Sequence, residues 1–272
     1  NSYFSLDLYS SVIISSCKIN SYIKHFFMDI IMITENYESI IKKSPKLPLF
    51  FCCDHASNLI PKEYNKLGLD TSILKSHIAY DIGAKILTKR LAKNFKTNAI
   101  LGKYSRLFLD LNRSEKHGNL IPETSDGIKI SNNINLTEKE QKYRINQFHK
   151  PYHTKLSNIL ESMDKIFLCK TSLICIHSFT PSLKDKIKRP WDIGLLYRKD
   201  KSLYKPIIES LKINKTFKIG ENKPYSGFEN VNYTMTNHGE KNKRPFISIE
   251  IRNDIFETNN RKKLNKLFKN IS

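Results

Sequence analysis

The sequence lacks several features, and each absence excludes a class of protein or site. It has no Cys-x-x-Cys pair among its five cysteines, which excludes a zinc site built on closely spaced thiolates. Two of the cysteines, Cys52 and Cys53, are neighbours in an apolar run, and with the odd count they are typical of packed free thiols. We therefore expect a cytoplasmic protein, because the cytoplasm keeps thiols reduced.

Residues 1–31 lack both an apolar run long enough to span a bilayer and the pattern of a signal peptide. We interpret them as an N-terminal extension of uncertain status, since the first methionine is Met28. The rest of the chain has no linker rich in Pro, Gly or Ser and no internal repeat, which predicts a single domain over residues 32–272. We expect no membrane partner, and the sequence leaves open whether the protein is a monomer or a homo-oligomer.

Negative charge is scarce, because 26 Asp and Glu residues stand against 46 Lys and Arg residues and give a formal net charge of +20. A surface of this sign attracts nucleic acids, anionic membranes and acidic metabolites. The excess is mostly lysine in a chain also rich in Ile and Asn, as expected of an AT-rich genome, and no nucleic-acid-binding motif accompanies it. A basic nucleic-acid-binding protein is therefore an alternative that rests on charge alone, and we expect no specific nucleic-acid partner.

Short apolar runs alternate with helical patterns along the chain. Strands are predicted at residues 49–53, 98–102, 172–176, 193–197 and 246–251, and helices at residues 82–95, 202–211 and 259–270. A capping box at Thr137 begins a further, long amphipathic pattern that reaches Met163. This alternation predicts an α/β fold with a mostly parallel central sheet covered by helices on both faces.

Polar residues follow or interrupt three of the predicted strands. His55 comes just after the first strand and is preceded by Asp54, His177 follows residues 172–176, and Glu250 stands within the last strand. Ligands bind at the carboxyl edge of an open α/β sheet, so we expect these side chains to converge there. Two imidazoles from separate strand ends form a natural zinc pair, which a carboxylate and an open position for water would complete.

Glu250 is the most informative of these residues. Alternation within residues 246–252 puts three isoleucines on one face of the strand and Glu250 on the other, and the strand should be central. A buried carboxylate is costly unless it is paired or lies beside a metal. A salt bridge to Arg252 or Arg106 is the alternative to a functional role.

A further cluster of polar residues contains Arg106, Asp110, Asn112 and Arg113 in one run with strand-like alternation. Guanidinium groups suit the bidentate binding of a carboxylate. A solvated charged loop is the alternative interpretation. Together with the histidines at the strand ends, the run favours an anionic substrate.

These residues belong to a series of short motifs that resembles the N-formylglutamate amidohydrolase family. The motifs are, in order, CDHASNLIP, HIAYDIGA, SRLFLDLNR, FHKPYH, HSFTP, RPWDIGLLY, PYSG and HG followed by ISIEIRNDI, and they cover about residues 46–258. The resemblance implies a three-layer, phosphorylase/hydrolase-like α/β fold, similar to that of zinc carboxypeptidases and related deacylases.

The resemblance also implies a metal site. His55 and His177 would bind Zn²⁺, as two histidines do in the wider group of zinc enzymes. The carboxypeptidases have a glutamate three residues after the first histidine, whereas this sequence has Asn58 there. The third ligand must come from elsewhere, and we expect Asp81, with Asp54 as its rival.

The other implied roles concern the reaction and the substrate. Glu250 would be the general base and Arg106 would help to stabilise the oxyanion, while Asn112 and Arg113 would hold the substrate carboxylate. Further substrate contacts are expected from Ser57, His238 and Arg252. His149 and His153 have a spacing that can bind metal, but we interpret them as packing or supporting residues.

The resemblance therefore implies a zinc-dependent hydrolase that converts N-formylglutamate and water to formate and glutamate. Its partner would be a small acidic N-acyl amino acid. A related deacylase or carboxypeptidase, acting on another N-acyl amino acid or on a cell-wall peptide, is the alternative among enzymes.

Overall fold

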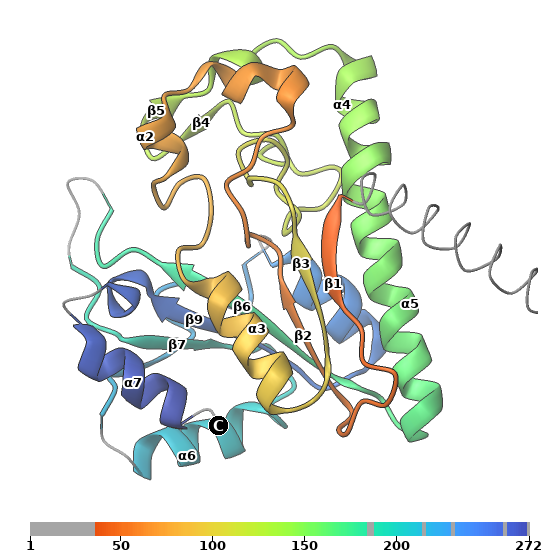
Figure 1. Ribbon diagram of the computed structural model, residues 1–272, viewed down its shortest axis with the longest axis vertical. Coiled ribbons are helices and arrows are strands. Elements are labelled where there is room, and N and C mark those ends of the chain that lie inside the picture. The colour runs from red at the N-terminus through yellow and green to blue at the C-terminus, as the bar shows by residue number, and fades with distance from the viewer. Residues whose placement is uncertain (1–35, 184–187, 214–215, 230–231, 258–259, 271–272) are drawn as a thin grey trace, which may run out of the picture. The chain divides into compact units, whose positions relative to one another are not determined.

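The computed structural model describes residues 36–183, 188–213, 216–229, 232–257 and 260–270 (Figure 1). The interpretation of residues 1–31 as an N-terminal extension concerns a segment outside these ranges. From Asn36 onward the chain forms one compact unit. Within the described ranges, no helix is both long enough and apolar enough to cross a membrane.

A seven-stranded sheet forms the centre of this unit. In spatial order its strands are β1 (Tyr37–Ile40), β3 (Asn98–Gly102), β2 (Leu49–Cys53), β6 (Ser172–Phe179), β9 (Phe246–Arg252), β7 (Ile193–Leu196) and β8 (Ile219–Glu221). The central strands β3, β2, β6 and β9 are parallel, whereas β1 and β7 run antiparallel to β3 and β9. The predicted α/β fold with a mostly parallel sheet is confirmed.

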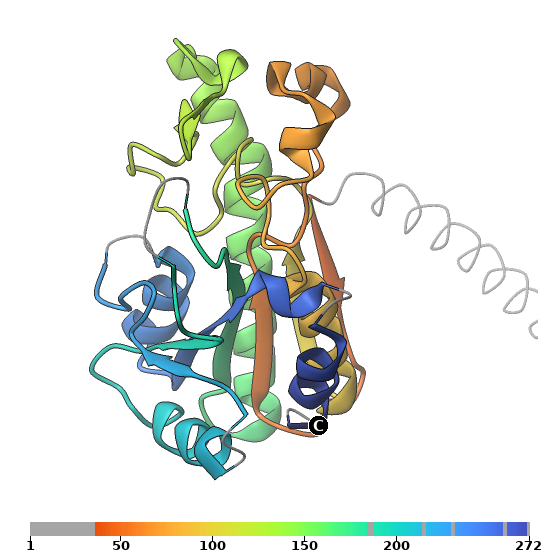
Figure 2. The ribbon, with the colours of Figure 1, turned by 90° about the vertical axis from the view of Figure 1, so that its left-hand side faces the viewer.

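Helices cover both faces of the sheet (Figures 1 and 2). On one face lies α5 (Lys150–Phe167), and on the other lie α3 (Ala84–Asn94), α6 (Tyr204–Ile213) and α7 (Arg261–Asn270). The buried side chains of α5 recur every three or four residues, which is the apolar stripe that a helix covering a sheet requires.

Two apolar cores result, one on each side of the sheet. Phe50 and Cys52 of β2 belong to the core under α5, and Phe51 and Cys53 to the core under α3, because alternate strand residues point to opposite faces. Both cysteines are buried free thiols. Their interpretation as packed residues is therefore confirmed.

Shorter elements connect the main ones. They are α2 (Thr71–Leu74), α4 (Glu138–Arg144), the hairpin strands β4 (Thr124–Ser125) and β5 (Ile128–Lys129), the 3₁₀ segments η1 (Lys62–Gly68), η2 (Ser131–Asn133), η5 (Glu240–Asn242) and η6 (Asn253–Phe256), and the π-helical segments η3 (Ile145–His149) and η4 (Met235–Gly239). The segments α4, η3 and α5 follow one another without a break.

The long helix predicted from Thr137 contains a π-helical turn. Thr137 caps α4 as the capping box predicts, since its Oγ1 accepts the backbone N–H of Glu140 at 3.2 Å. The helix widens in η3 and then continues as α5. Periodicity did not predict this turn, because the apolar pattern stays helical on both sides of it.

Two element boundaries differ from the prediction near the carboxyl edge of the sheet. Strand β6 continues to Phe179, so His177 lies within the strand and not after it, because β9 offers backbone partners along this whole stretch. Helix α3 begins at Ala84, two residues later than predicted. Gly83 has a φ of +84°, which is incompatible with a right-handed helix and ends the preceding turn.

Candidate active site

The carboxyl ends of β2, β6 and β9 bring three predicted site residues together. His55 follows the end of β2, and His177 and Glu250 are paired residues on the adjacent parallel strands β6 and β9. Their exposed fractions are only 2%, 4% and 6%, respectively. In the sheet, β2 lies between β3 on one side and β6 on the other, so the order of the strands reverses at β2. Open α/β sheets bind their ligands at the carboxyl ends of the strands beside such a reversal.

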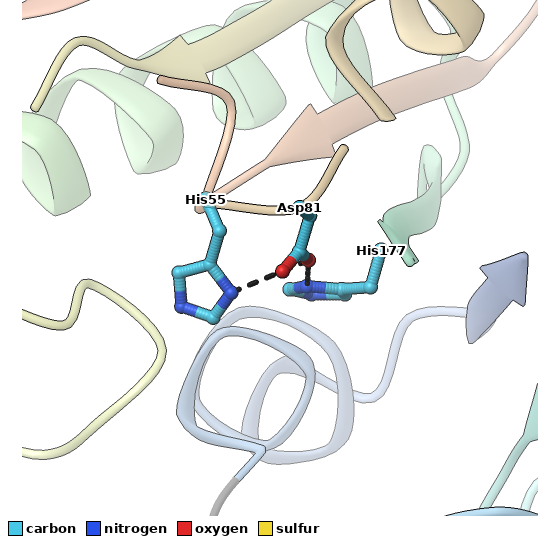
Figure 3. Close-up of side chains that lie close together, drawn as sticks. All are labelled: His55, Asp81 and His177. Atoms are coloured by element: carbon cyan, nitrogen blue, oxygen red, sulfur yellow. Dashed lines mark hydrogen bonds and ion pairs between the residues drawn. The ribbon is translucent and has the colours of Figure 1, made fainter. Parts of the chain in front are cut away.

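A carboxylate lies between the two imidazole rings (Figure 3). Asp81 Oδ2 is 2.8 Å from His177 Nδ1 and 3.4 Å from His55 Nδ1. Asp81 lies just before α3, and its backbone N–H donates to the carbonyl of His55 at 2.9 Å. One potential ligand atom from each of these three residues lies within 4.8 Å of the others, so together they could hold a metal ion.

The outer nitrogen of each ring faces a further carboxylate. His55 Nε2 lies 2.6 Å from Asp110 Oδ1, and His177 Nε2 lies 3.6 Å from Asp54 Oδ2. Carboxylates in this position fix the orientation and the tautomer of a metal-binding histidine. In the structure His177 Nδ1 donates to Asp81 Oδ2. With the proton on Nε2 instead, each ring would offer Nδ1 as a ligand atom to a metal ion.

Several buried polar atoms of the cluster make no hydrogen bond to any described residue, namely His55 Nδ1, Asp54 Oδ2 and Glu250 Oε2. Such atoms cost free energy unless a ligand, an ion or water satisfies them. Two imidazole nitrogens and one carboxylate are also a donor set that zinc uses in hydrolytic sites. The residues present therefore fit a divalent metal ion.

The electrostatics of the cluster point the same way. Burial, the largest single effect, favours the neutral forms of these carboxyls. The positive charge of His55, together with the other hydrogen bonds and charges around Asp81 and Asp110, outweighs burial and holds the pKa of both carboxyls below the ordinary value. Against the effect of burial, the hydrogen bond and charge of Asp81 raise the pKa of His177 to about 10. At Glu250 burial dominates and raises the pKa to about 7. The cluster thus attracts positive charge, which a cation would supply.

A pocket of about 200 Å³ opens onto the cluster. Its lining consists of His55, Asp81, Arg106, Asn112, Arg113, His177, Ser178, Tyr225, Asn232 and Glu250. A guanidinium nitrogen of Arg106 lies 3.1 Å from Asp110 Oδ2, and the other lies 3.6 Å from Asp81 Oδ1. The residues that we expected to bind the metal, to act as general base and to bind the substrate carboxylate therefore all line one pocket.

A model of the N-formylglutamate amidohydrolase family matches residues 47–257 of the sequence. The chain belongs to this family. No functionally curated protein matches the sequence. The structure of the gene product Atu2144 from Agrobacterium tumefaciens is similar to this chain with 27% identity and a TM-score of 0.79, over 87% of this chain and 93% of that one. The N-formylglutamate amidohydrolase from Ralstonia eutropha JMP134 is 18% identical with a TM-score of 0.61, over 87% and 94% of the two chains, which shows a shared fold.

Membership in the N-formylglutamate amidohydrolase family confirms the resemblance that the motif series indicated, and it supports a hydrolase. The structure also shows what Asn58 does at the position where the zinc carboxypeptidases have a glutamate ligand. Asn58 donates through Nδ2 to the carbonyl of Leu74 at 2.8 Å, and it is not among the residues that line the described pocket. Its amide therefore supports the neighbouring chain segment.

Three residues that we expected to contact the substrate do not line the pocket beside the two histidines. They are Ser57, His238 and Arg252. The Ser57 hydroxyl accepts the backbone N–H of Leu59, and His238 Nε2 lies 2.9 Å from His153 Nδ1. Arg252 forms an ion pair with Asp192 at 2.9 Å. The alternative salt bridge from Arg252 to Glu250 is therefore wrong, since the guanidinium group is engaged elsewhere.

The sequence assigned no role to several residues that complete the site. In SRLFLDLNR Asp110 is part of a charged run, and in the structure its carboxylate contacts the His55 ring and the Arg106 guanidinium group. Tyr225, in the motif PYSG, and Asn232 line the pocket from the loop between β8 and η4. Only the motifs themselves could have indicated these residues, because no periodicity places a loop against a strand end.

Proposed function

We propose that this chain hydrolyses the amide bond of N-formylglutamate and releases formate and glutamate. The proposal rests chiefly on the convergence of His55, Asp81, His177 and Glu250 in one buried pocket of a member of this family. Zn²⁺ is the metal that we propose for the site, because the donor set is that of hydrolytic zinc enzymes.

His55, Asp81 and His177 would hold the ion, which would polarise the substrate carbonyl and lower the pKa of the attacking water. We propose Asp81 as the third ligand because it faces the Nδ1 atoms of both rings. Asp54, its rival, faces only Nε2 of His177, and its other oxygen accepts the hydroxyl of Tyr152 at 2.7 Å. That arrangement suits a group which orients the ring.

Glu250 is the proposed general base. Its carboxylate is buried at the pocket, and Oε2 makes no hydrogen bond within the described structure, so it can accept a proton from water and pass it to the leaving nitrogen. Arg106 lines the same pocket and is held by Asp81 and Asp110. Its guanidinium group would stabilise the negative charge that develops on the carbonyl oxygen.

Asn112 and Arg113 are the proposed binding groups for a substrate carboxylate. Asn112 Oδ1 accepts the backbone N–H of Thr234 at 3.0 Å. The Nδ2 NH₂ group of the same side-chain amide can therefore donate to an anion. Arg113 lies beside it in the pocket lining, with a side chain 15% exposed. A neutral and a charged donor on adjacent residues suit a carboxylate.

Replacement of Glu250 by Gln tests the mechanism. The variant keeps the size of the side chain but cannot accept the proton, so turnover of N-formylglutamate should fall by about a thousandfold. Elemental analysis should still find about one metal ion per chain, because Glu250 is not a proposed ligand. Formate release gives the rate.

Glu209→Gln, a change on the exposed side of α6, is the matched control and should keep the wild-type rate. Near-normal formate release by Glu250→Gln would show that another group is the base. A wild-type protein that holds metal but releases no formate would contradict the proposed substrate.

A second chamber favours a second candidate function. It has a volume of about 240 Å³ and adjoins the first pocket, with which it shares Asp81, Arg106, Ser178 and Tyr225. His77 and Asp126 line it as well. A formyl group contains one carbon atom and does not need this space. A deacylase or carboxypeptidase that acts on a larger N-acyl amino acid or a cell-wall peptide would use it. A higher kcat/KM for N-acetylglutamate or N-succinylglutamate than for N-formylglutamate would favour this candidate.

A further inference from the structure

Three consecutive carbonyl groups beside the pocket accept hydrogen bonds from distant parts of the chain. The carbonyl of Leu111 accepts from His153 Nε2 at 2.9 Å, that of Asn112 from the backbone N–H of Tyr233 at 3.2 Å, and that of Arg113 from His149 Nε2 at 2.9 Å. Residues 111–113 lie in a turn, outside helices and strands. Within the turn, the N–H groups of Asn112 and Arg113 donate to Asp110, whereas the three carbonyl groups are held mainly by these external donors.

A chain of hydrogen bonds leads away from Leu111. A carbonyl can only accept, so His153 Nε2 carries the proton. A neutral imidazole has one donor and one acceptor nitrogen, so His153 Nδ1 accepts from His238 Nε2 at 2.9 Å. By the same argument His238 Nδ1 accepts from the hydroxyl of Ser157 at 3.2 Å. Every proton in this chain points towards Leu111, and each tautomer is fixed by its neighbour.

The three rings are held in a dry and neutral state. His149, His153 and His238 are 1%, 7% and 2% exposed. Burial lowers the pKa of all three, and that of His238 to about 4, so the rings stay neutral near pH 7. Neutral rings preserve the direction of this series of hydrogen bonds. A second proton on His153, at Nδ1, would face the N–H of His238 and break the bond between the two rings.

Two of the three histidines lie in the π-helical segments, and His153 lies in α5. His149 is the last residue of η3, and His238 lies within η4. Such segments are frequent at functional sites. None of the three rings lines the described pocket, so they can act on a ligand only through the residues they hold.

We propose that His149, His153 and His238 are positioning residues that hold Asn112 and Arg113 in the geometry needed for the substrate carboxylate. The inference rests on the proposed function, in which Asn112 and Arg113 bind that carboxylate. Loss of a donor would let the turn rotate, and two donors that must act together would no longer meet the anion.

Two substitutions of His149 form a matched test. Leu removes the N–H at similar volume, whereas Gln places an amide N–H near the former Nε2. His149→Leu should raise the KM for N-formylglutamate about tenfold, with kcat within about threefold of wild type, because the loss falls on binding. His149→Gln should recover most of the affinity. His153→Leu should raise the KM in the same way. His153→Gln should recover only part of the affinity, because it restores the donor to Leu111 but not the acceptor for His238.

A substrate analogue separates positioning from a general structural effect. Its carboxylates are replaced by carboxamides, so it makes little use of Arg113. His149→Leu should lower kcat/KM for the carboxylate substrate and leave the value for the analogue nearly unchanged. Equal losses on both substrates, or a loss confined to kcat, would overturn the proposal.

Binding of glutarate, a simple dicarboxylate, distinguishes failure of this inference from failure of the proposed function. Should the wild-type protein release no formate, calorimetry with glutarate still compares wild type, His149→Leu and His149→Gln. Weaker binding in the Leu variant with recovery in the Gln variant supports positioning, and equal binding in all three overturns it.

Ser157→Ala covers the case in which the Leu variants do not fold. It removes the donor at the partly buried end of the chain, so the KM for N-formylglutamate or the Kd for glutarate should rise by about threefold. An unchanged value would overturn the role of the chain from Ser157 to Leu111.

Discussion

Asp81 and Asp54 are both buried beside His177, yet they face different nitrogens of its ring. Asp81 lies 2.8 Å from Nδ1 and Asp54 lies 3.6 Å from Nε2. A ligand and an orienting carboxylate have the same charge and similar burial, so the atom that each one faces decides between the two roles. Asp110 holds His55 Nε2 in the way that Asp54 faces His177.

The two proposed roles predict a ranking of metal affinity. Asp81→Asn removes a proposed ligand charge and should weaken zinc binding by more than about a hundredfold, while Asp54→Asn should weaken it by about tenfold. Competition with a chromophoric chelator measures both affinities. The reverse ranking would transfer the third ligand position to Asp54.

At the scale of elements, the close approach of β3 to the end of β2 positions the turn that carries His55. A Cβ atom at Gly102, the last residue of β3, would lie 2.1 Å from the carbonyl oxygen of Asp54 and 2.9 Å from the side chain of Leu111. The two strands can therefore keep this spacing only with glycine at this position.

Gly102→Ala should push the Asp54 carbonyl away and displace His55. We expect a loss of about 1–3 kcal/mol in the free energy of unfolding, which is typical of overpacking, together with weaker metal binding. Urea unfolding and metal analysis measure the two effects. Gly118→Ala is the control, since a Cβ there meets no atom within 4 Å of the described structure. Unchanged metal binding in Gly102→Ala would show that β3 does not position His55.

An ion pair ties α5 to the segments before β6 and β9. Arg244 donates to both oxygens of Asp164 at 3.0 and 3.2 Å, and the backbone N–H of Thr171 donates to the same carboxylate at 2.7 Å. Burial opposes ionisation of Asp164, but these bonds prevail and lower its pKa to about 2. Arg244 itself is 4% exposed and also donates to the carbonyl of Thr171.

This lowered pKa predicts how stability depends on pH. The contribution of Asp164 is fully present above the unfolded pKa of about 4 and is lost as the pH falls through about 2. Asp164→Asn should cost about 1 kcal/mol at pH 7, since solvent reaches part of the pair, and the gap to wild type should narrow below pH 4. Urea unfolding at several pH values tests this. A gap that stays constant down to pH 2 would contradict it, and Glu161→Gln on exposed α5 surface is the control.

At the scale of the whole molecule, the net charge of +20 predicts weak attraction to any polyanion. Because this attraction comes from counterion release and not from a binding motif, association with duplex DNA should be detectable at low salt and vanish near 0.2 M. Fluorescence anisotropy with a labelled duplex measures it. Sequence-selective binding that survives such salt would restore the nucleic-acid-binding alternative.

The central strands could be predicted from the sequence, and the structure shows why the edge strands could not. The predicted bounds of β2 and β3 match the structure, because both are buried apolar runs with polar flanks. The edge strands β1 and β8 were not predicted, since YESI and IGE are short and carry little apolar signal. The antiparallel direction of β7 was also unforeseen, because local periodicity has no information about which way a strand runs in the sheet.

The sequence by itself determined the fold class, the family and the chemical types in the pocket, because these depend on local periodicity and on motifs. It placed His55, His177 and Glu250 at the carboxyl edge of the sheet for the same reason. Only the tertiary structure decided which carboxylate faces which ring nitrogen, and that Arg252 and His238 do not line the pocket. Periodicity fixes the face on which a side chain lies, whereas the distance between two side chains from separate strands and loops is set by packing across the sheet.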